Sequence, residues 1–132
     1  MKIGNKIFKG KRTVLYFYPK DDTPGCTTEA IEFTQLLPRF KALGVDVVGV
    51  SLDSAASHEK FCKKYHLGIP LLTASLEEIK QLGILSDSGT SAKRSTFILD
   101  KKGDIEKKYE NVKAKGHAEV VLDYLINDRR KN

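Results

Sequence analysis

One cysteine in the sequence stands where its sulfur could act as a nucleophile. Cys26 lies in YPKDDTPGCTTEA, residues 18–30, directly after the apolar run TVLYFY. Pro19 ends a predicted strand because proline has no N–H to donate to a ladder. Thr23 suits the N-cap and Pro24 the first turn of a helix, so Cys26 falls in that turn. Unpaired N–H groups and the positive end of the helix dipole favour an anion there. The predicted chemistry is that of a reactive thiolate.

Keeping such a sulfur ionised requires more than the helix. An ordinary thiol, with a pKa near 8.5, is only a few per cent ionised at neutral pH. Lowering a thiol pKa by two units takes about 2.7 kcal/mol, whereas a helix N-terminus supplies about 0.3–1 kcal/mol. A hydroxyl donor and a cationic side chain must supply the rest. Thr23 is the nearest hydroxyl, and we expect Asp21 and Asp22, whose charges would oppose ionisation, to face solvent.

The residues alone leave other interpretations of the two cysteines open. Cys26 could be a small apolar filler in an ordinary strand-to-helix turn. Disulfide exchange of the Cys-x-x-Cys type is excluded, because the residues after Cys26 are TTE. The second cysteine, Cys62, lies on the apolar face of a predicted helix, where buried cysteines are common.

Length and composition predict a single domain over residues 1–132 with its own core. Apolar residues make up 40% and charged residues 30%, which is typical of soluble proteins. No apolar run approaches about 18 residues, so no membrane span is predicted. The apolar run near the start is also too short for a secretory signal. We therefore expect a cytoplasmic protein, or a mature form whose targeting segment has been removed.

Neither the charge nor the metal-ligating residue types indicate a further ligand. The net charge is +6, but the basic residues are scattered and no nucleic-acid-binding signature accompanies them. A solvated basic surface is predicted, with no nucleic acid as partner. Cys62 and His66 stand four apart on a predicted helix and could form half of a metal site, but no second pair has matching spacing. No metal or other cofactor is predicted.

The elements that must position Cys26 follow from hydrophobic periodicity. Residues 13–18 and 45–51 are predicted to be buried strands, and residues 24–43 and 54–68 helices. Pro38 is expected to kink or split the first helix. The remaining predicted elements are a brief strand IPLLT, a capped helix from Ser75 to Leu82, a loop over 83–94, a hairpin of STFILD and IEKKYE, and a helix over 117–126. This order predicts an α/β sandwich and resembles a thioredoxin-like fold, a central mixed sheet with flanking helices.

At this point the sequence resembles a known family. FYPKDDTPGCTTE matches the peroxiredoxin signature Pro-x-x-x-Thr-x-x-Cys through Pro19, Thr23 and Cys26. The full stretch around this signature is similar to the peroxiredoxin Q, or bacterioferritin comigratory protein, subfamily. GVDVVGVSLDS, SHEKFCKKYHL, RSTFILD and KGHAEVVLDYL match in the same order, so the resemblance covers residues 12–127. It implies reduction of hydrogen peroxide and organic hydroperoxides without a cofactor, recycling by thioredoxin or a similar dithiol, and a monomer.

The resemblance also implies roles for individual residues. Cys26 would be the peroxidatic cysteine, which attacks the O–O bond and becomes a sulfenic acid. Thr23 would hydrogen-bond the sulfur and the peroxide, and Pro19 would pack over the site and limit access of water. Arg94, the first residue of RSTFILD, would supply the missing cation. Glu29 would help to hold Arg94 in place.

Two features depart from the subfamily. Many members carry a resolving cysteine five residues after the first, and that position here is Ile31. A further subset of the family has its resolving cysteine in the next helix, so the resemblance implies Cys62 as the candidate resolving cysteine. If Cys62 is core filler, an external thiol must resolve the sulfenic acid. The start, MKIGNKIFKGK, lacks the usual Pro-x-Phe-x-Leu strand, so the N-terminal hairpin is expected to be missing. The alternative function is a redox-sensing or interaction module that is oxidised at Cys26 without useful turnover.

Overall fold

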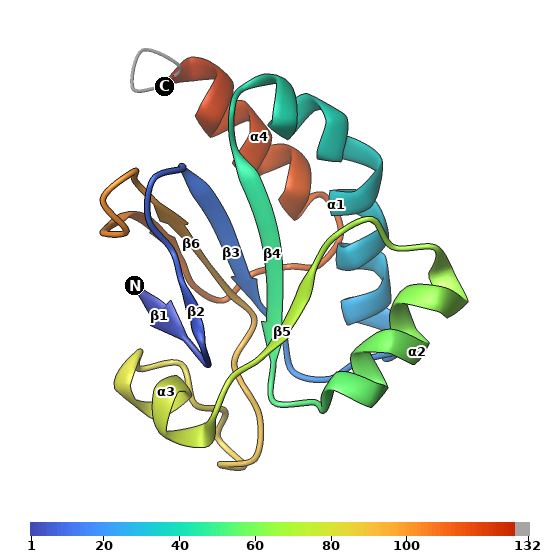
Figure 1. The fold of residues 1–132 in the computed structure, drawn as a ribbon. Helices are drawn as coiled ribbons and strands as arrows, with labels where there is room; N and C mark the ends of the chain where they lie inside the picture. Colours follow the sequence, from blue (N-terminus) through green and yellow to red (C-terminus); the bar gives the residue numbers. More distant parts are fainter. Residues whose placement is uncertain (129–132) are drawn as a thin grey trace.

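A computed structural model describes residues 1–128, in which a five-stranded mixed sheet carries the helices (Figure 1). The strand order is β5-β4-β3-β6-β7. The central strand β3 pairs parallel with β4 and antiparallel with β6; β5 extends the parallel side and β7 the antiparallel side. The strands are β3 (Thr13–Phe17), β4 (Asp46–Ser51), β5 (Leu71–Thr73), β6 (Ser95–Leu99) and β7 (Ile105–Tyr109). This arrangement confirms the predicted α/β fold with a mixed sheet.

Helices cover both faces of the sheet (Figure 1). Three of them, α1, α2 and α4, lie on one face, while α3 and a small hairpin of β1 and β2 lie on the other. The helices are α1 (Pro24–Ala42), α2 (Ala55–Tyr65), α3 (Leu76–Gln81) and α4 (His117–Asn127), and the hairpin strands are β1 (Lys2–Ile3) and β2 (Lys6–Ile7). Among residues 1–128, no helix combines the length and apolarity needed to cross a bilayer.

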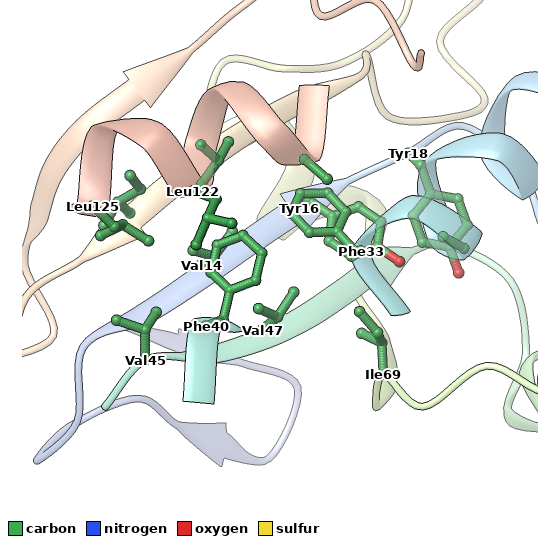
Figure 2. Close-up of a cluster of buried hydrophobic side chains, with 14 of the residues drawn as sticks. Val14, Tyr16, Tyr18, Phe33, Phe40, Val45, Val47, Ile69, Leu122 and Leu125 are labelled. Carbon is green, nitrogen blue, oxygen red and sulfur yellow. The ribbon is translucent and has the colours of Figure 1, made fainter. Parts of the chain in front are cut away.

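Strand β3 is buried at every position, and its residues from Val14 to Phe17 are apolar or aromatic because both faces of the strand are covered. Val14 and Tyr16 face the cluster under α1 and α4, and Leu15 and Phe17 face the cluster under α3 and the hairpin. Figure 2 shows the first cluster, in which the ring of Tyr16 lies against Phe33 of α1, with 4.5 Å between ring centroids. The two clusters pack against both faces of β3, and the loop before Cys26 begins at the end of this strand.

Two expectations about the backbone need correction. α1 continues through Pro38 as one helix of 19 residues, so the expected split is wrong, while a kink at Pro38 stays a prediction. Pro38 is exposed, whereas Phe33 and Phe40 on either side of it are fully buried, so packing maintains the helix despite one lost backbone bond. The N-terminal hairpin is not missing either: β1 and β2 form a short antiparallel one, anchored by the buried Ile3 and Phe8.

Candidate active site

Cys26 lies in the first turn of α1, as the Thr-Pro-Gly sequence before it predicts. Thr23 is the N-cap residue, with an extended backbone, and a proline occupies the first turn. The side chain of Thr23 makes no capping bond; its hydroxyl donates to the carbonyl oxygen of Lys20 at 2.8 Å. A hydroxyl has one proton, so the expected hydrogen bond from Thr23 to the sulfur is not made. Pro19 is half-buried at the end of β3.

Arg94 reaches the sulfur from a distant part of the chain. Its Nη2 donates to Cys26 Sγ at 3.4 Å, and its Nη1 donates to Glu29 Oε1 at 2.8 Å. The sheet explains the meeting: β6 runs antiparallel to β3, and Ser95 pairs with Phe17. The first residues of β6 therefore lie beside the last residues of β3, at the edge where α1 starts.

The site is buried and holds a chain of three ionisable groups. Cys26 is 1% exposed and Glu29 is 0% exposed, whereas Arg94 is half-buried. Burial raises the pKa of Glu29 to about 7, although Arg94 acts in the opposite direction. Burial also acts to lower the pKa of Arg94, but Glu29 and Cys26 outweigh it and the net shift is upward. The guanidinium therefore stays positive between a sulfur and a carboxyl group.

Gly25 is a site residue that sequence reasoning missed. A Cβ atom at Gly25 would lie 2.9 Å from Arg94 Nη2, closer than such atoms approach in proteins. The absence of a side chain lets the guanidinium lie against the first turn of α1. The sequence signal for this role was the glycine between Pro24 and Cys26. Glycine weakens a helix, so its presence in the first turn indicates that another group approaches the backbone closely there.

Gly25→Ala is therefore expected to displace Arg94 and to slow oxidation of the Cys26 sulfur about tenfold, equivalent to ~1.4 kcal/mol of lost transition-state stabilisation. Gly68→Ala is the matched control, because a Cβ there meets Leu37 and Thr34 only at 3.6 and 3.7 Å. Second-order rate constants for hydrogen peroxide measure the effect. Equal rates for the two alanine variants would contradict this role of Gly25.

Both aspartates before Cys26 were expected to face solvent, and for Asp21 this expectation is wrong. Asp21 is 7% exposed; it accepts hydrogen bonds from Tyr18 and Ser57 and pairs with His58 Nδ1 at 2.8 Å. These partners compensate the desolvation of a buried carboxylate and keep its pKa low. Asp22 is exposed, as predicted.

Cys62 lies on α2, in surroundings different from those of Cys26. It is half-buried and lines a groove of about 380 Å³ between α2 and β5, together with His58. Burial raises the pKa of the Cys62 thiol, and the charge of Asp21 raises it further. Both cysteines are free thiols in this structure.

Within residues 1–128, no group of three or more His, Cys, Asp or Glu side chains could hold a metal ion.

Comparison with known proteins identifies the family. Residues 2–108 match the AhpC/TSA family model. Peroxiredoxin Bcp of Xanthomonas campestris is 41% identical over 123 residues, which cover 88% of this chain and 77% of that protein. The chain belongs to the AhpC/TSA family and is a peroxiredoxin. This confirms the resemblance to the peroxiredoxin Q and bacterioferritin comigratory protein subfamily.

Two further relatives place this peroxiredoxin among known sequences and structures. Chloroplastic peroxiredoxin Q of Triticum aestivum is 47% identical over 106 residues, 79% of this chain and 49% of that protein. The chain thus spans about half the length of this plant relative. The bacterioferritin comigratory protein of Xanthomonas campestris, solved in a study of alkyl peroxide reduction, superposes with a TM-score of 0.82 at 38% identity. That match covers 91% of this chain and 80% of the solved one.

Proposed function

We propose that this peroxiredoxin reduces hydroperoxides through the thiolate of Cys26, that Cys62 resolves the resulting sulfenic acid, and that thioredoxin or a similar dithiol reduces the disulfide. The contact of Arg94 with Cys26 carries the proposal. Arg94 supplies the positive charge that the thiolate needs, because a helix N-terminus alone does not stabilise the ionised sulfur enough.

The first step needs only groups that surround the sulfur. The Cys26 thiolate attacks one oxygen of ROOH and breaks the O–O bond, giving Cys26–SOH and an alkoxide that takes up a proton to leave as ROH. Arg94 stabilises the ionised sulfur and the negative charge that develops on oxygen. Because the Thr23 hydroxyl donates to Lys20, its oxygen is available to accept the peroxide O–H. Glu29 holds Arg94 by a second, charge-assisted bond.

Two observations support Cys62 as the resolving thiol. It lies on α2, which contacts the loop that precedes Cys26. In addition, two solved variants of Xanthomonas campestris peroxiredoxin Q have cysteine replaced by serine at positions separated by as many residues as Cys26 and Cys62. In the second step Cys62 attacks the sulfenic sulfur, the new S–S bond forms, and water leaves.

Organic hydroperoxides are proposed as substrates alongside hydrogen peroxide, because the solved relative from Xanthomonas campestris is described by its alkyl peroxide reduction activity. We propose a dithiol as the reductant because a dithiol returns both Cys26 and Cys62 to thiols. A monomeric state, cytoplasmic location and a single domain over residues 1–132 stay predictions, and the mechanism depends on none of them.

Peroxide consumption coupled to thioredoxin tests the proposal. Cys62→Ser is expected to consume about one equivalent of peroxide and then stall, because its sulfenic acid has no internal partner. Cys26→Ser is the control in which no sulfenic acid forms at the site. Mass spectrometry distinguishes a disulfide, which has lost two hydrogens, from a sulfenic acid, which has gained an oxygen.

Each contrary result removes a separate part of the proposal. Full activity of Cys26→Ser would show that the nucleophile is wrong. Undiminished thioredoxin-dependent turnover of Cys62→Ser would assign resolution to an external thiol. Slow turnover of the parent protein despite rapid oxidation of Cys26 would favour the redox sensor.

A further inference from the structure

Two consecutive aspartates fasten α2 to the loop that leads to Cys26. Asp21 accepts a hydrogen bond from Ser57 at 2.8 Å and pairs with His58, both in the first half of the helix. Asp22 accepts from Lys64 at 2.8 Å and from Tyr65 at 2.7 Å, at the end of the helix. We call these four contacts the aspartate clamp. Figure 1 shows the loop between β3 and α1 running beside α2.

α2 depends on contacts of this kind. It has 11 residues, and isolated helices shorter than about 12–15 residues are marginal in water. Of its side chains only His58 and Phe61 are buried, and His58 belongs to the clamp. The apolar anchoring of α2 comes from Phe61 and the partly buried Tyr65, and the bonds to Asp21 and Asp22 add polar contacts in its first half and at its end.

The positions of the two sulfurs make that attachment relevant to the reaction. Cys26 is buried against Arg94, whereas Cys62 lines the groove between α2 and β5. A disulfide requires Cα atoms within about 7 Å and suitably directed side chains, so both thiols must leave these environments. Local opening of α2 and of the first turn of α1 provides that movement.

From this arrangement we infer that Asp21 and Asp22 act as positioning residues: the aspartate clamp keeps α2 folded while Cys26 meets peroxide, and its release limits disulfide formation. The inference rests on the proposed role of Cys62. Slower release leaves the sulfenic acid exposed for longer to a second peroxide, which converts Cys26–SOH to Cys26–SO₂H and water.

The double variant Lys64→Met/Tyr65→Phe tests the clamp, because it removes both contacts of Asp22 and keeps the aliphatic stem and the ring. Lys63→Met is the matched control: Lys63 pairs with Glu59 within the same helix and does not contact the loop. After a single pulse of peroxide, the double variant should form the disulfide about two- to fivefold faster than the parent, the range expected for losing one or two exposed polar contacts. Hydrogen exchange of α2 in the reduced protein should accelerate in the same proportion.

The rate of sulfenic acid formation separates positioning from general destabilisation. It should be unchanged in the double variant, with less sulfinic acid at high peroxide, while Lys63→Met matches the parent in every measurement. If the disulfide forms at the same rate in all three proteins, the clamp does not limit release and the inference is overturned. If no disulfide forms in the parent, the proposed role of Cys62 is wrong. Hydrogen exchange would then still report whether the contacts hold the helix.

Discussion

Arg94→Met is expected to lower the second-order rate constant for hydrogen peroxide about 100-fold, the loss seen when one donor to a developing negative charge is removed. Methionine keeps much of the side-chain volume and removes the charge and both hydrogen bonds, to Cys26 Sγ and to Glu29. Two effects combine: the ionised sulfur loses its cation, and so does the oxygen that leaves. Glu29 also becomes a buried carboxyl group without a partner, since its Oε2 already has none within residues 1–128.

Two companion variants make this prediction specific. Lys93→Met removes one positive charge from the neighbouring residue, which is exposed and lies 4.0 Å from Asp87, and should leave the rate unchanged. Arg94→Lys keeps the charge but not the two-pronged geometry, so its rate should lie between those of the parent and Arg94→Met. A rate for Arg94→Met within about threefold of the parent would show that other groups dominate stabilisation of the sulfur.

The elements of this fold are predictable from sequence because they rest on local patterns. The continuous apolarity of β3, the capping box at Ser75 and the Thr-Pro-Gly start of α1 each correspond to an observed element. Pro38 shows the limit of such reasoning, because the burial of Phe33 and Phe40 outweighs its local cost. Packing of this kind depends on α4, which lies far along the chain.

The site shows the same division. A need for a cation follows from the chemistry of a thiolate, and the resemblance indicates Arg94. The buried Asp21 could not be predicted, because Tyr18, Ser57 and His58 come from separate parts of the chain and meet only in the folded protein. The direction of the Thr23 hydroxyl depends on the turn at Lys20, which leaves no signal in residue type.

Two buried groups beside Arg94 should impose opposite pH dependences on stability. The folded-state pKa of Glu29, about 7, lies above its ordinary 4.5, so its contribution is complete below pH 4.5 and is lost as pH rises through 7. The pKa of His117 is lowered to about 4, by burial first and then by the charge of Arg94. Its contribution is complete above pH 6.5 and is lost as pH falls through 4.

The pKa shifts of Glu29 and His117 are similar in size and opposite in sign. Their effects on the free energy of unfolding should therefore nearly cancel in the parent protein between pH 4.5 and 6.5. Glu29→Gln removes one of them, and its free energy of unfolding should then rise with pH by about 2–3 kcal/mol over this window. His117→Gln, which can keep a hydrogen bond to Thr96, should show a fall of similar size.

Urea denaturation of the reduced proteins at several pH values measures all three slopes. The lowered pKa of Asp21 acts below this window and does not interfere. Parallel profiles for the parent and both variants would mean that neither group titrates differently in the folded state. Opposite slopes for the two variants would establish that folding disfavours both the ionisation of Glu29 and the protonation of His117.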